Sequence, residues 1–218
     1  MDPLQYWAQL FQNSSIIIAA LVAIFGIDAW RREYVGKRRM ELAEEVLALF
    51  YQVRDILGAI RNPVGFNGEG ESRKAGENES PETKKALDLA YVVVERYNKH
   101  VEVFARLHAL RYRFMAQVGI IESQPFDELD QVLNQIFLAA RRLAREWSRH
   151  ERQFASEADR ASFMKRLRES EAIFWSGEDP DPIEDKVEGL IAKIEVTCMD
   201  ILRSRGTLFG LINLPIGK

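Results

Sequence analysis

This chain of 218 residues contains three histidines, which are candidate ligands for a metal ion. A di-iron centre in a helical bundle needs two Glu-x-x-His pairs, because that spacing places both ligands on one helix face. Here Glu95 precedes His100 by five residues, and Glu146 precedes His150 by four. The sequence also lacks the His-Glu-x-x-His pattern of zinc proteases. The spacing predicts no metal site, and we expect His108, which falls on an apolar stripe, to lie in the core.

The single cysteine, Cys198, limits the redox chemistry that the chain can support. One thiol cannot form a disulfide within the chain or a multi-cysteine zinc site, and this cysteine usage fits a reducing cytoplasm. Cys198 lies on the apolar stripe of a predicted helix, so we expect a buried and unreactive thiol rather than a nucleophile. We accordingly predict no catalytic residue and no cofactor.

A glycine-rich segment, residues 64–80, reads VGFNGEGESRKAGENES and raises the question of phosphate binding. It lacks the Gly-Lys-Ser/Thr ending of a P-loop, and no strand precedes it. Four glutamates, which would repel phosphate, outnumber Arg73 and Lys74; they are Glu69, Glu71, Glu77 and Glu79. We interpret the segment as a mobile connector, with a protein-docking loop as the alternative.

Four arginines recur at steps of four and three, which places them on one face of a predicted helix; they are Arg141, Arg145, Arg149 and Arg152. Guanidinium groups pair well with carboxylates and phosphates, so this arginine line is a candidate site for an acidic protein, a lipid headgroup or a nucleotide. We prefer the alternative of a solvated face, or of pairing with the acidic segment 178–188. The net formal charge of −3 gives no general attraction to nucleic acid.

An apolar run from Ile16 to Ile27 lies between Trp7 and Trp30. Twelve apolar residues alone are short for a membrane span, but tryptophan is typical of both membrane interfaces. The 24 residues from Trp7 to Trp30 measure about 36 Å as a helix, which fits a bilayer with its interfaces. We therefore predict a membrane anchor at 1–30. A core helix, an amphipathic interfacial helix and a cleaved signal are the alternatives.

The charges after this run predict its direction. The juxtamembrane segment 31–39 carries five basic residues against Glu33, namely Arg31, Arg32, Lys37, Arg38 and Arg39. The positive-inside rule places such a segment in the cytoplasm and the N-terminus outside. A signal peptide has the opposite layout, with a basic start and a small-residue cleavage site. We expect Trp7, Trp30 and the five basic residues to contact the lipid bilayer and its anionic inner leaflet.

The rest of the sequence has helical periodicity and no comparable strand pattern. Helices are predicted at about 40–62, 80–118, 126–154, 156–175 and 181–206, with the loop at 63–80. Ser80, Ser156 and Asp181 are predicted N-caps. The Met40 to Ile60 stripe has coiled-coil-like spacing. The predicted fold is all-α, with one N-terminal transmembrane helix and an elongated four- to five-helix cytoplasmic bundle at 40–206. The apolar tail 207–218 is expected to dock on the bundle, or on membrane or a partner.

This layout resembles bacterial inner-membrane proteins that have one N-terminal signal-anchor helix and a small cytoplasmic helical domain. The resemblance implies a single-pass protein with its bulk in the cytoplasm. We expect a non-catalytic scaffold, or an accessory or assembly subunit of an inner-membrane complex, with a protein partner or a homo-oligomer. A membrane-anchored regulatory or phage-defence effector that acts through oligomerisation is the alternative, and an enzyme with a dispersed site is a third.

Overall fold

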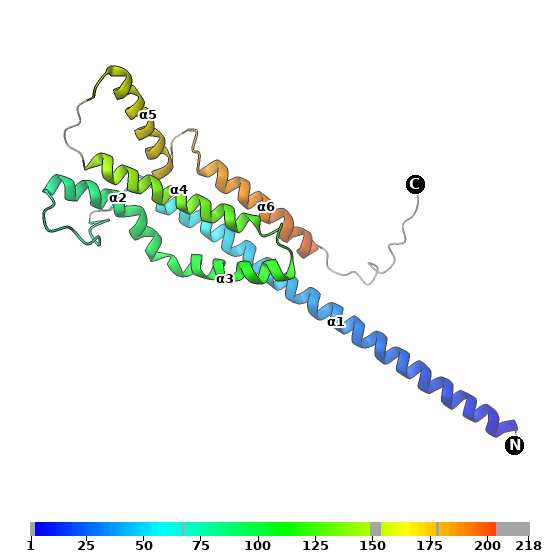
Figure 1. The fold of residues 1–218 in the computed structure, drawn as a ribbon. Helices are drawn as coiled ribbons and strands as arrows, with labels where there is room; N and C mark the ends of the chain where they lie inside the picture. The colour runs from blue at the N-terminus through cyan, green and yellow to red at the C-terminus, as the bar shows by residue number, and fades with distance from the viewer. Residues whose placement is uncertain (1–2, 67, 149–153, 178, 204–218) are drawn as a thin grey trace, which may run out of the picture.

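The computed structural model describes residues 3–66, 68–148, 154–177 and 179–203. These residues form six α-helices and no strand, which confirms the all-α prediction. The helices are α1 (Pro3–Ile60), α2 (Pro81–Lys99), α3 (Val101–Gln117), α4 (Gln124–Trp147), α5 (Glu157–Phe174) and α6 (Glu184–Arg203). The second half of α1 is part of the helical bundle, whereas its first half projects alone from it (Figure 1).

The projecting half of α1 is apolar on every side. Its large side chains are between 48% and 67% exposed; they are Ile16, Ile17, Ile18, Leu21, Val22, Ile24, Phe25 and Ile27. Within Ser14–Ile60, this helix is long and apolar enough to cross a membrane, and the apolar stretch is not buried in the protein. A helix that is hydrophobic all round needs a cover, and nothing in the described bundle supplies one.

The second half of α1 forms the centre of the bundle. Its predicted stripe is buried, with Ala43, Val46, Phe50, Val53, Leu57 and Ile60 all at most 2% exposed. The Phe50 ring meets Phe126 of α4 edge-on, with the ring centroids 4.9 Å apart. The stripe with coiled-coil-like spacing is therefore covered within the chain, and a second copy would have to contact another surface.

The predicted helix at 80–118 is wrong in one respect, because it is divided at His100. This residue has φ −120° and ψ 12°, and its backbone N–H bonds to Tyr97 and Asn98 instead of continuing the ladder. The division lets α2 pack on α4 while α3 packs on α1. The Tyr97 ring fills the corner, 4.7 Å from Phe104 and 5.1 Å from Phe137. One straight helix could not cover both neighbours.

The remaining helices close the bundle. The predicted caps are confirmed, since Ser80, Ser156 and Asp181 each accept hydrogen bonds from backbone N–H groups at the start of a helix. α4 ends at Trp147, earlier than the predicted 154, and its last ring packs edge-on against Phe174 of α5. The turn between α3 and α4 and the end of α6 lie at the end of the bundle from which α1 projects (Figure 1).

Candidate functional site

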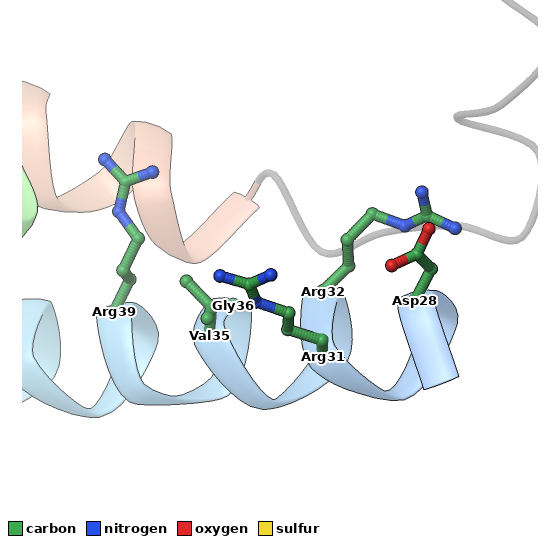
Figure 2. Close-up of a pocket in the computed structure, with 6 residues that line it drawn as sticks. All are labelled: Asp28, Arg31, Arg32, Val35, Gly36 and Arg39. Atoms are coloured by element: carbon green, nitrogen blue, oxygen red, sulfur yellow. The ribbon is translucent and has the colours of Figure 1, made fainter. Parts of the chain in front are cut away.

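The basic segment lies where α1 leaves the bundle, and its side chains surround an open pocket of about 440 Å³. Among the described residues, the lining comes from α1: Asp28, Arg31, Arg32, Val35, Gly36 and Arg39. Figure 2 shows Arg32 and Arg39 on the same side of the helix, with Gly36 between them. A helix rises about 10 Å over seven residues, and Gly36 has no side chain to fill the space between the two guanidinium groups.

Arg39, which lines this pocket, has one hydrogen-bond donor without a partner among the described residues. Its side chain is half-buried, and its Nε–H is buried without a hydrogen-bond partner among the described residues. A buried charged donor without a partner is costly, so an anion beside it would be stabilising. Arg31, Arg32 and Arg39 together suit a phosphate group, because guanidinium forks bind phosphate oxygens through paired hydrogen bonds. The geometry thus fits the predicted contact with anionic lipid.

The aromatic residues that flank the apolar run are also exposed. Trp7 is 58% exposed and Trp30 is 67% exposed. Trp30 stacks on Tyr34 with ring centroids 5.8 Å apart, and the guanidinium carbon of Arg38 lies 4.8 Å from the centre of the Tyr34 ring. These steps of four place an aromatic and basic strip along one face of α1, immediately after the apolar run. Amphipathic rings backed by a cation are typical of a membrane interface.

The arginine line is placed only in part. Arg141 and Arg145 are exposed on α4, and Leu138, three residues before Arg141, is 48% exposed on the same face. Arg149 and Arg152 lie outside the described residues. Where side chains are described, no ion pair joins the line to the acidic segment 178–188. Asp181 of that segment instead binds Arg61, so the suggested pairing between line and segment is not what the described residues show.

The glycine-rich segment, which we interpreted as a mobile connector, is joined to α2 by two ion pairs, Arg96 with Glu69 and Arg73 with Asp88. Arg96 of α2 is 7% exposed, and its guanidinium reaches back to the end of α1. It donates to the carbonyls of Asn62 at 2.6 Å and Val64 at 3.1 Å, and to the Glu69 carboxylate at 2.6 Å. The hydrogen bond from Arg96 lowers the pKa of Glu69 despite the opposing effect of burial. One arginine thus fastens the first part of the loop.

A second arginine fastens the other part. Arg73 pairs with Glu79 and, at 3.0 Å, with Asp88. Its hydrogen bonds lower the pKa of Glu79 to about 2. Between the two arginines, Gly70 has φ +88°, and a Cβ on it would lie 1.9 Å from the carbonyl oxygen of Asp88. Two of the glutamates expected to repel phosphate thus pair with arginines: Glu69 with Arg96 and Glu79 with Arg73.

A buried ion pair that the sequence did not suggest joins α1, α5 and α6. Arg61 donates to Asp181 at 2.8 Å, and their side chains are 3% and 4% exposed. Arg61 also donates to the carbonyls of Ala172, Ile173 and Trp175 at the end of α5, at 2.7–2.9 Å. Burial alone would raise the pKa of Asp181, but the hydrogen bonds from Arg61 and two backbone amides outweigh it, so the pKa is lowered. In the sequence, the one feature that pointed to this ion pair was the predicted N-cap at Asp181.

Where the structure describes them, the residues first considered for metal or redox chemistry are not brought together; His150 lies outside the described residues. His108, predicted in the core, is exposed, and its ring packs edge-on against Tyr112 at 5.6 Å. The α3 stripe runs through Phe104, Leu107 and Phe114 instead. Cys198 is fully buried as predicted, and burial raises its pKa to about 12. Among the described residues, no three His, Cys, Asp or Glu side chains group so as to hold a metal ion.

Comparison of the chain with known protein families, with curated proteins and with solved structures gives no match.

Proposed function

We propose that the chain is a single-pass protein of a bacterial inner membrane, whose cytoplasmic helical bundle is a non-catalytic scaffold or accessory subunit of a membrane protein complex. The first half of α1 is the anchor, and residues 31–39 lie at the cytoplasmic leaflet. The positive-inside rule supports this orientation, and the Arg31, Arg32 and Arg39 pocket suits the phosphates of anionic lipid.

The observation that carries the proposal is the unbroken course of α1 from an exposed apolar half into the bundle core. A flexible linker would let a tethered domain search freely. A continuous helix instead fixes the height and rotation of the bundle relative to the membrane. A fixed orientation suits a subunit that presents one face to a neighbour, and the tether keeps that face at high local concentration beside membrane partners.

The partner face that we propose is the exposed surface of α4 formed by Leu138, Arg141 and Arg145. Their spacing of three and four residues aligns them on one side of the helix. Arginine is enriched in protein interfaces, and its charge favours an acidic partner.

The test is extraction of the full-length protein from its native membrane in mild detergent, followed by measurement of the mass and composition of the complex. A second protein at fixed stoichiometry is the expected result. Reversing charge in Arg141→Glu/Arg145→Glu should reduce recovery of that protein by about tenfold, because two attractive contacts become repulsive. Arg168→Glu, on the exposed side of α5, is the matched control and should change nothing. A lone monomer would sink the proposal.

A homo-oligomer would instead favour the second candidate, a membrane-anchored effector that acts by self-association. The projecting half of α1 carries a series of small residues that supports it: Ser15, Ala19, Ala23 and Gly26. Small residues at steps of three and four let two membrane helices approach closely. Under this alternative, a growth defect that depends on a stimulus should follow overexpression, and replacement of Ala23 and Gly26 by leucine should abolish it.

A further inference from the structure

The turn between α3 and α4 exposes two consecutive isoleucines. Ile120 is 72% exposed and Ile121 is 74% exposed, more than the large apolar side chains described in the projecting half of α1. Turns in soluble proteins normally carry polar residues at such positions. Adjacent large apolar side chains at the tip of a turn indicate a contact that the chain itself does not supply.

The turn holds these side chains outward by its own hydrogen bonds. The Ser123 hydroxyl donates to the Ile120 carbonyl at 2.7 Å, and the Gln124 N–H donates to the Ile121 carbonyl at 3.1 Å. Gly119 has φ +155°, and a Cβ there would lie 2.0 Å from the Glu122 carboxylate. The backbone of the turn is thus satisfied internally and needs no partner, whereas the isoleucine side chains remain uncovered.

The position of the turn points to the bilayer as its cover. α3 runs back along α1 toward the projecting half (Figure 1), and Arg106 and Arg113 both pair with Glu45 of α1. Since α3 ends soon after Arg113, the turn lies level with about residue 40 of α1, roughly 15 Å along the helix beyond Trp30.

Helix tilt brings the turn closer to the lipid. Transmembrane helices are tilted by about 20° on average and by up to about 40°, so a tilt of about 30° is within the usual range. The axis of α3 is displaced sideways by about 10 Å, so the same tilt lowers the turn by about 5 Å if α1 leans toward α3. The isoleucine backbone then stands about 8 Å from the level of Trp30, at the outer edge of a headgroup layer about 5–8 Å thick, and the side chains can reach into that layer.

We propose that Ile120 and Ile121 form a second membrane contact, which sets the direction in which the bundle leans on the inner leaflet. This inference rests on the proposed membrane anchor. The acid of the turn, Glu122, is half-buried against Gly119 rather than directed at the leaflet.

The experiment uses the full-length protein in vesicles of phosphatidylcholine and phosphatidylglycerol. Single variants Ile121→Cys, Val64→Cys and Val22→Cys are labelled with an environment-sensitive fluorophore, while buried Cys198 stays unlabelled. Val64 is 68% exposed but lies at the opposite end of the bundle, so it is the matched control. Quenching by lipids with a shallow nitroxide should be about threefold stronger at position 121 than at 64, as expected for interfacial apolar insertion. Equal quenching at the two positions would overturn the second contact.

Position 22 separates this inference from the proposed anchor. Strong quenching there by a deep nitroxide, without quenching at 121, would leave the anchor intact and reject the second contact. No quenching at 22 would reject the anchor itself. A blue shift at 121 without any quenching by lipid would show that protein, for example a second copy, covers the turn, and would also reject the proposal.

Discussion

At the scale of single residues, three buried or half-buried arginines join helix ends and a loop that lie outside the apolar core. Arg61 joins the ends of α1 and α5 to the start of α6, while Arg73 and Arg96 fold the glycine-rich loop onto α2. Each neutralises carboxylates and also binds backbone carbonyls, so desolvation of its charge is compensated by several hydrogen bonds.

Replacing Arg61 with methionine should destabilise the fold by about 3–5 kcal/mol, because it leaves the buried Asp181 carboxylate without its cation and several carbonyls without a donor. Thermal unfolding of the full-length protein in detergent, followed by circular dichroism, measures the change. Arg54→Met is the matched control, since Arg54 is more exposed and pairs with its neighbour Asp55; it should cost less than about 1 kcal/mol. Similar costs for both variants would contradict the central role of Arg61.

Two glycines should respond in opposite directions to alanine. Gly70→Ala places a Cβ against the carbonyl of Asp88 at a positive φ, so it should destabilise the protein by about 2 kcal/mol or more. Gly58 lies in α1 with no atom near its potential Cβ, and Gly58→Ala should stabilise by about 0.5–1 kcal/mol, because alanine has the higher helix propensity. The difference in melting temperature between the two variants checks the loop geometry directly.

At the scale of elements, periodicity predicted most helices because their apolar residues recur at helical spacing and face one shared core. The spacing from Met40 to Ile60 was sufficient to place the second half of α1, and the caps at Ser80 and Ser156 placed the starts of α2 and α5. The division at His100 was not predictable, because no proline or glycine marks it; it arises from α2 and α3 packing on different helices. Composition suggested a mobile loop at 63–80, but its order depends on arginines that are distant in sequence or buried only in the folded chain.

The loop should loosen in acid. The pKa values of Glu69, Glu79 and Glu95 are all lowered from the ordinary 4.5, to about 2 for Glu79. The unfolded chain therefore binds more protons in this range, and the stabilisation present above about pH 4.5 is lost as the pH falls toward 2. Unfolding free energies measured across this range should decrease steadily. In Glu79→Gln the decrease should be shallower; an identical pH dependence in the two proteins would show that the Arg73 pair contributes nothing.

At the scale of the whole molecule, we propose that the basic segment on α1 decides which side of the membrane holds the bundle. Replacing Arg31, Arg32, Lys37, Arg38 and Arg39 with glutamine removes the charge that the positive-inside rule requires. The bundle should then be inverted or mixed in orientation, as measured by protease protection in intact cells and in inverted vesicles. Replacing an equal number of exposed lysines and arginines on α5 and α6 is the control. Unchanged orientation in the first variant would show that another feature sets topology.

Because α1 is continuous from the proposed anchor into the bundle, the direction in which the bundle faces depends on the number of residues between the two. Each residue added between Trp30 and Met40 would lift the bundle by about 1.5 Å and turn it by about 100°. Two added residues would direct the α4 face almost opposite to its present bearing, while four would bring it back to within about 40°. The length of the segment between lipid and bundle thus sets the rotation of the bundle as well as its distance from the membrane. A protein partner in the membrane would therefore respond to a change of a single residue in that length.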